Sequence, residues 1–217
     1  MSVVEQPRSA GLVARVMGMI TKPAAEWDVI EGETATVQGL FTGYVCILAA
    51  IGPIVTAVKM LMGFSELGLM SSFMPFVPHL GPVAIVGSAV ISYVEALVTI
   101  FAVGFLLDAI APSFDGQKNQ VQAMKLAVYS WTAVWVAQIA LIIPWLGGLV
   151  VLAALFYSLY TFWIGAPKMM KTPADKSSGY AIVCMGASLV AALLVAAVLG
   201  ELNRMVFYGS VMGGGLF

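Results

Sequence analysis

The stretch SAVISYVEALVTIF, residues 88–101, is apolar enough to lie inside a lipid bilayer, yet it carries Glu95 near its centre. Of the 217 residues of the chain, 61% are hydrophobic and 10% are charged, and the mean hydropathy is +0.99. A single soluble core cannot bury so much apolar surface, so the composition predicts an integral membrane protein in contact with a lipid bilayer. The ten basic and eleven acidic residues give no concentrated basic surface, which argues against a nucleic-acid partner.

Five apolar runs in the sequence are long enough to cross a bilayer, which requires roughly 20 predominantly apolar residues per helix. The runs cover residues 38–62, 81–110, 121–143, 145–166 and 179–199. They predict an all-α membrane protein with five transmembrane helices. The expected organisation is an interfacial segment over 1–37, a transmembrane domain over 38–200 and a short extracytoplasmic tail over 201–217.

The distribution of lysine and arginine predicts the orientation, because positively charged loops are retained on the cytoplasmic side. A cytoplasmic N-terminus places eight of the ten basic residues on that side, leaving Lys59 and Arg204 toward the other face. The eight are Arg8, Arg15, Lys22, Lys118, Lys125, Lys168, Lys171 and Lys176. We therefore expect the N-terminus inside and the C-terminus outside.

The segment before the first span has the pattern of amphipathic helices that lie on the inner leaflet. Apolar residues recur there at helical spacing, with Arg8 and Arg15 off the stripe, and Pro23 opens a second short segment. The stripe consists of Leu12, Val13, Val16, Met17 and Ile20. On the opposite side of the membrane, the apolar residues 63–80 are expected to fold back against the bundle, and their lone His79 is not expected to bind a metal.

A polar stripe runs through the second span and includes the carboxylate of the opening stretch. Ser88, Ser92, Glu95 and Thr99 follow one another at offsets of four, three and four, so they share one helix face. Such a face should point toward other helices or water. Glu95 lies fifteen positions from residue 110, which is about 22 Å at the helical rise per residue.

Three interpretations of Glu95 stay open, because an ionised carboxylate in hydrocarbon costs several kcal/mol. A neutral Glu95 could hydrogen-bond to Gln138 or Thr56, which are expected at a similar depth. It could instead pair with Lys59, whose long side chain reaches back along its helix. Finally, it could line a water-filled path for a cation or proton.

A second polar group is expected near the inner membrane edge. Asp108 ends the second span and Lys125 begins the third, so the two are expected to form an interfacial salt bridge. Tyr129 and Tyr157 continue the polar faces of the third and fourth spans. Tyrosines at this depth are either membrane anchors or the lining of a cytoplasmic-facing cavity.

Small residues repeat every four positions in the last span and allow close helix packing. They are Ser188, Ala192, Ala196 and Gly200. This surface serves either packing within the bundle or a homo-oligomer contact between subunits.

Three sequence pieces resemble the bacterial branch of the Yip family, the Ypt-interacting proteins. They are KPAAEWDVIEGE (22–33), FDGQKNQVQAMKLAVYSWTAVW (114–135) and YSLYTFWIGAPKMMKTPADKSSGYAIV (157–183). The resembling positions include Tyr157, Tyr160, Gly165, Pro167, Lys168, Met169, Met170, Pro173, Lys176 and Tyr180. Ala133 departs from the family pattern, in which a proline is common. The resemblance implies five spans, a cytoplasmic N-terminus and a location in the bacterial inner membrane.

The third of these pieces also suggests local roles. Gly165 and Pro167 are expected to end the fourth helix, because proline cannot continue the hydrogen-bond ladder. Lys168, Lys171 and Lys176 follow just outside the bilayer. They either attract anionic lipid headgroups, at about 1 kcal/mol each, or only determine topology.

The sequence argues against catalysis, since it has one histidine, no H-E-x-x-H and no G-x-S-x-G. No cofactor or metal site is predicted. Eukaryotic members of the resembling family act in vesicle traffic and bind small GTPases and each other, so the first hypothesis is a non-catalytic membrane-organising or assembly protein with membrane-protein partners. The alternative is a channel or carrier for a cation, proton or small solute that uses Glu95.

Overall fold

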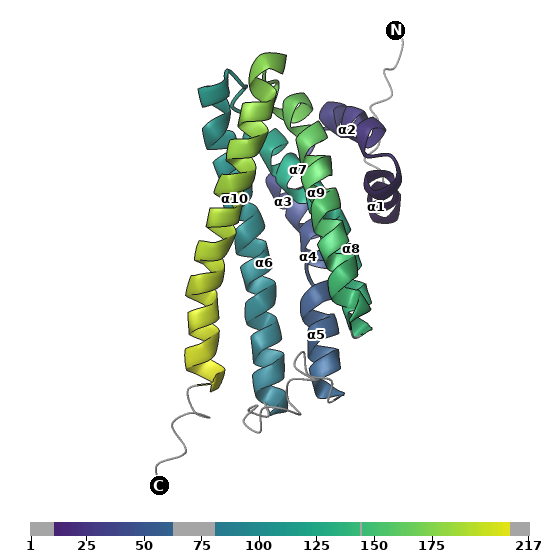
Figure 1. The fold of residues 1–217 in the computed structure, drawn as a ribbon, viewed down its shortest axis with the longest axis vertical. Helices are drawn as coiled ribbons and strands as arrows, with labels where there is room; N and C mark the ends of the chain where they lie inside the picture. The colour runs from purple at the N-terminus through teal and green to yellow at the C-terminus, as the bar shows by residue number, and fades with distance from the viewer. Residues whose placement is uncertain (1–10, 63–80, 144, 209–217) are drawn as a thin grey trace.

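All regular elements in the described part of the chain are helices, which form an elongated bundle (Figure 1). The computed structural model describes residues 11–62, 81–143 and 145–208. Five helical segments in it are long and apolar enough to cross a membrane: Val37–Leu61, Pro82–Phe114, Gln120–Ile142, Leu146–Met170 and Ala174–Phe207. They overlap the five predicted runs, so the prediction of an all-α protein with five such helices is confirmed. The side of the membrane on which each end lies remains a prediction.

The first span is an interrupted helix. It consists of α3 (Val37–Leu40), a π-helical turn (Phe41–Val45), α4 (Cys46–Leu48) and α5 (Ile51–Leu61). The Thr36 hydroxyl begins it by accepting a hydrogen bond from the Gly39 amide at 3.0 Å. The break between α4 and α5 lies one turn before Pro53, whose nitrogen cannot donate to the preceding turn.

The second and fifth spans are the longest and pack along one another (Figure 1). They are α6 (Pro82–Ile110) and α10 (Ala174–Asn203). At the end of the bundle distant from α2, Ser88 Oγ donates to Asn203 Oδ1 at 2.9 Å. A Cβ added at Gly87 would lie 2.0 Å from the Phe207 ring, so the glycine allows this aromatic ring to approach α6.

The third and fourth spans form a helical hairpin. The third consists of α7 (Gln120–Ser130), α8 (Thr132–Ala137) and a 3₁₀ turn (Gln138–Ile142), and the fourth is α9 (Leu146–Met170). The backbone reverses next to Trp145, which has a left-handed φ of 71°.

The fourth helix does not end where the sequence predicted. It continues through Pro167 to Met170 and stops at Lys171, which adopts a left-handed φ of 53°. Proline removes only one donor, and the buried packing of Ala166, Met169 and Met170 holds the last turn in place. The expectation of an end at Gly165 and Pro167 was therefore wrong.

Two short helices lie against one end of the bundle, α1 (Leu12–Thr21) and α2 (Pro23–Gly32) (Figure 1). Both have inward-facing residues that are buried, among them Met19, Trp27 and Ile30. They join a core built mainly at this end from Met124, Leu126, Met169, Met170 and Tyr180.

Within α1, the burial of Arg15 is a feature that the sequence did not predict. Arg15 is only 2% exposed, whereas Val13 is 72% and Met17 55% exposed. The sequence placed Arg15 off the apolar stripe, and in the structure its side chain points into the bundle, where its partners Glu26 and Glu33 lie. The predictions about Arg8, about the segment 63–80 with His79, and about the tail beyond residue 208 fall outside the described residues.

Candidate functional site

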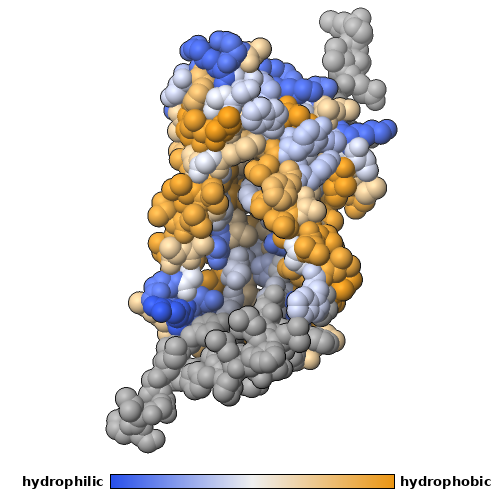
Figure 2. Space-filling model, viewed as in Figure 1, coloured by the Kyte–Doolittle hydropathy of each residue, from blue (hydrophilic) through white to orange (hydrophobic). Residues whose placement is uncertain are grey.

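A cavity of about 540 Å³ lies between α5, α6, α8 and α10, and we call it the Glu95 cavity. Its polar lining residues are Thr56, Ser88, Ser92, Glu95, Thr99 and Gln138. Figure 2 shows the molecule hollowed on this face between apolar flanks, with hydrophilic and weakly polar atoms inside the hollow. The structure therefore brings together the complete stripe of the second span and Gln138 of the third.

The stripe faces the cavity because α6 carries its bulky apolar side chains on another face. Val94, Val98 and Phe101 are each more than 40% exposed on the outside of the bundle. Glu95 lies thirteen residues after Pro82 and fifteen before Ile110, so it occupies the middle of a helix roughly 44 Å long. The carboxyl group is thus far from both ends of the span.

Two oxygen acceptors of the Glu95 cavity have no donor among the described residues. The Glu95 carboxylate makes no hydrogen bond or ion pair within that part of the chain. Gln138 Oε1 is buried without a hydrogen-bond partner there. The Gln138 amide packs on Gly52, where an added Cβ would lie 2.3 Å from Oε1. The expected hydrogen bond from Glu95 to Gln138 or Thr56 is therefore not formed.

Lys59 also differs from its expected role. It is buried on α5, but it does not line the Glu95 cavity and forms no ion pair with Glu95. Since Glu95 and Lys59 do not meet, the ion-pair interpretation of Glu95 does not describe this structure.

A second polar group, the Arg15 cluster, comprises Arg15, Glu26, Glu33 and Tyr129 at the α2 end of the bundle. Arg15 Nη1 donates to Glu26 Oε1 at 2.5 Å, and Nη2 donates to both carboxylate oxygens of Glu33. The guanidinium carbon lies 5.4 Å from the centre of the Tyr129 ring. A smaller cavity of about 240 Å³ is lined by Arg15, Glu33 and Tyr129 together with Tyr44.

The junction of α7 and α8 separates the two cavities. Tyr44 and Tyr129 line the smaller cavity, whereas Trp131 lines the Glu95 cavity. The Tyr44 hydroxyl is hydrogen-bonded to Thr132 Oγ1 at 2.8 Å, and Thr132 Oγ1 donates to the Tyr129 carbonyl oxygen at 2.7 Å. These bonds satisfy the hydroxyl groups of Tyr44 and Thr132 at this junction.

Lys125 and Asp108 do not form the salt bridge that the sequence predicted. Lys125 Nζ donates to the carbonyl oxygens of Ile30 at 2.9 Å and Glu33 at 2.5 Å, where α2 ends. Asp108 Oδ1 is buried without a hydrogen-bond partner in the described chain. The carbonyl groups at the end of α2 provide the ammonium with acceptors that the sequence alone did not reveal.

Tyr157 holds α1 and lines neither of the two cavities described above. Its hydroxyl lies 3.1 Å from the Met19 carbonyl oxygen and 2.8 Å from that of Ile20. Of the four residues expected around a cytoplasmic-side cavity, Tyr129 alone lines one of the two cavities described above.

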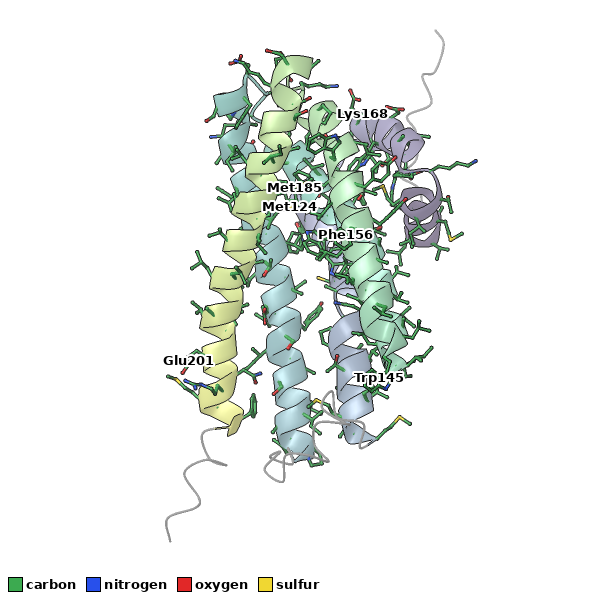
Figure 3. The ribbon with its side chains drawn as sticks, viewed as in Figure 1. Met124, Trp145, Phe156, Lys168, Met185 and Glu201 are labelled. Carbon is green, nitrogen blue, oxygen red and sulfur yellow. The ribbon has the colours of Figure 1, made fainter. Side chains whose placement is uncertain are left out.

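The three lysines predicted to contact lipid headgroups are paired within the protein. Lys168 pairs with Asp28, Lys171 with Glu31, and Lys176 with Asp115. Lys168 also donates to the Ala24 carbonyl oxygen at 3.0 Å, and Figure 3 shows it beside α2, at the end opposite Glu201. Two of these pairs tie α2 to the end of α9.

The small-residue ladder of α10 faces partly into its own bundle. Ala192 and Ala196 line the Glu95 cavity. Gly200 lies farther along, with no atom within 4 Å of an added Cβ apart from its own helix. Two of the four small residues of the ladder thus form part of the cavity wall.

The described residues contain no group of three or more His, Cys, Asp or Glu that could hold a metal ion.

The family model of the Yip1 domain matches residues 17–199. The chain belongs to the Yip1-domain family. No curated protein and no solved structure matches the chain. The match to the Yip1 domain includes α2, the first four spans, most of the fifth span and the lining of the Glu95 cavity, and it agrees with a multi-pass membrane protein.

Proposed function

We propose that this Yip1-domain protein is a non-catalytic membrane protein that binds a small cation or hydrogen-bond-donating solute in the Glu95 cavity, as a channel or carrier. The observation that carries the proposal is the presence of two acceptors, Glu95 and Gln138, without donors in the described chain around one cavity. In a bilayer, acceptors without donors are costly, so water or a ligand must supply the missing hydrogen bonds.

The purely structural role that competes with this proposal has less support. Structural glue requires Glu95 to bond with a neighbouring helix, and the described residues provide no such bond. The packing around Glu95 also leaves about 540 Å³ of space, which is within the size range of small-molecule sites.

Flux measurements in liposomes test the proposal. Purified protein is reconstituted, and proton, K⁺ and Na⁺ movement is followed for the native sequence and for Glu95→Gln. Glu201→Gln is the matched control, because Glu201 forms an exposed pair with Arg204 at the far end of α10. Glu95-dependent flux that Glu201→Gln leaves intact supports the proposal, and equal flux with Glu95→Gln contradicts it.

A membrane-organising or assembly role is the second proposal, and family membership supports it. The cytoplasmic location of α1 and α2, which this proposal also assumes, agrees with the charge distribution. Co-purification from the native membrane after mild crosslinking provides its test: a stoichiometric membrane-protein partner is expected. A chain that remains without partners under all conditions would contradict assembly.

A further inference from the structure

We propose that the Glu95 cavity binds a primary ammonium group joined to an apolar chain. This inference rests on the proposed function and specifies its ligand class. It follows from the chemistry of three parts of the cavity: the acceptors, the aromatic and apolar lining, and the space.

The acceptors of the cavity match a primary ammonium group. An ionised carboxylate only accepts hydrogen bonds, and so does the amide oxygen of Gln138, while an ammonium offers three donors and a positive charge. The Ser92 and Thr99 hydroxyls lie on the same face as Glu95 and can accept the third bond. The Ser88 hydroxyl already donates its hydrogen bond to Asn203, so we do not count Ser88 among the acceptors for the ammonium.

The rest of the lining matches an apolar chain. Trp131, Trp135, Met60 and Leu193 contribute their side chains, together with several alanines. Indole rings attract cations, and their apolar surface also packs against methylene groups. A fully hydrated inorganic ion would leave this part of the lining unused.

A dehydrated metal cation is a poorer match. Divalent cations require about six to eight oxygen ligands in close contact. Glu95 provides the only carboxylate among the described lining residues, and the described chain has no group of acids that could hold a metal. A cavity of about 540 Å³ also exceeds the space of a bare ion many-fold.

The same chemistry has two sources, a free alkylamine and an ethanolamine phospholipid. The hollow in Figure 2 opens between apolar flanks of the bundle, so a ligand with a tail can reach it from the lipid. Both sources carry an ammonium with N–H donors, whereas a choline headgroup carries a quaternary nitrogen that has none.

Titration of the full chain in nanodiscs tests the inference. Octylammonium is compared with octanol, which has the same chain without charge, and with tetramethylammonium, which has the charge without N–H donors or a chain. Octylammonium should bind most tightly. Glu95→Gln should weaken its affinity about ten-fold or more, because a charge-assisted hydrogen bond is lost, and Glu201→Gln should leave it unchanged.

Gln138→Leu provides a second variant that keeps the charge, in case Glu95→Gln does not fold. It should weaken octylammonium binding by a smaller factor. The lipid source is tested by native mass spectrometry after release from ethanolamine or choline nanodiscs. Selective retention of the ethanolamine lipid, lost in Glu95→Gln, identifies a headgroup as the natural ligand, and octylammonium binding without such retention identifies a free amine.

Equal binding of octanol and octylammonium would overturn the ammonium class. Glu95-dependent flux of protons or K⁺ without amine or lipid binding would overturn this inference and leave the proposed function intact. Absence of both flux and binding would remove the two together.

Discussion

The Trp27 indole of α2 lies directly against Gly165 of α9. A Cβ added at Gly165 would be 2.5 Å from Trp27 Cε2, and Trp27 Nε1 donates to the Thr161 carbonyl oxygen at 2.9 Å. Trp27 is completely buried, so this contact anchors α2 on the bundle. Gly165 permits the contact because any side chain there would occupy the place of the ring.

Gly165→Val should therefore displace α2. The indole ring is rigid, so it cannot make room by rotating a flexible chain end. We therefore expect the free energy of unfolding to fall by about 1–3 kcal/mol. Hydrogen exchange should become faster in Pro23–Gly32. Gly186→Val is the control, since an added Cβ at Gly186 has no atom within 4 Å apart from its own helix. Unchanged exchange in α2 would contradict the anchoring role of Trp27.

Lys125→Met should destabilise the same helix from its other end. The substitution keeps much of the volume but removes the donor to the Ile30 and Glu33 carbonyl oxygens. The Ile30 carbonyl oxygen keeps the backbone N–H of Glu33 as a donor, but the Glu33 carbonyl oxygen loses the donor that Lys125 provided. Leaving a buried acceptor without a donor costs about 1–3 kcal/mol. Thermal unfolding in detergent measures the loss, with Lys118→Met in the exposed loop as the control. A melting temperature equal to that of the control would argue against the carbonyl contacts.

Arg15→Leu should be the most destabilising change in the Arg15 cluster. It leaves the Glu26 and Glu33 carboxylates without their common partner, at a cost of about 3–5 kcal/mol. Replacing Arg15, Glu26 and Glu33 together by leucine should recover much of the stability, since no buried charge of the cluster then lacks its partner. Arg15→Lys should be intermediate, because lysine cannot reproduce the planar fork of donors. Equal stability of Arg15→Leu and the triple variant would contradict an energetic coupling between Arg15 and the two carboxylates.

The sequence predicted the five spans and the polar stripe, because long apolar runs and helical spacing are local properties of the chain. It did not predict the partners of Arg15 or Lys168. Lys168 and Asp28 are separated by 140 positions, and a charged residue beside an apolar stripe has the same local pattern whether it faces solvent or a buried acid. The four acids of the piece 22–33 all form ion pairs, with Arg15 of α1 or with Lys168 and Lys171 at the end of α9, and nothing in their local pattern predicts these partners.

The pair of Lys168 and Asp28 should contribute little on its own. Asp28 is 64% exposed, so Asp28→Lys should cost below about 1 kcal/mol, and the reversed pair with Lys168→Asp should restore most of it. Unfolding measured at low and high salt is informative, because salt screens exposed charges. A cost of Asp28→Lys that persists at high salt would show that packing, rather than the charge pair, is responsible.

The bond between Trp27 and Thr161 joins positions 134 residues apart, which sets an order of events during synthesis. The N-terminal pair of helices leaves the ribosome first, while the surface that receives it is translated only with the fourth span. Until then, Asp28 and Glu31 of α2 lack their partners Lys168 and Lys171. Docking of α2, the earlier part of the chain, therefore requires that the fourth span has been inserted correctly.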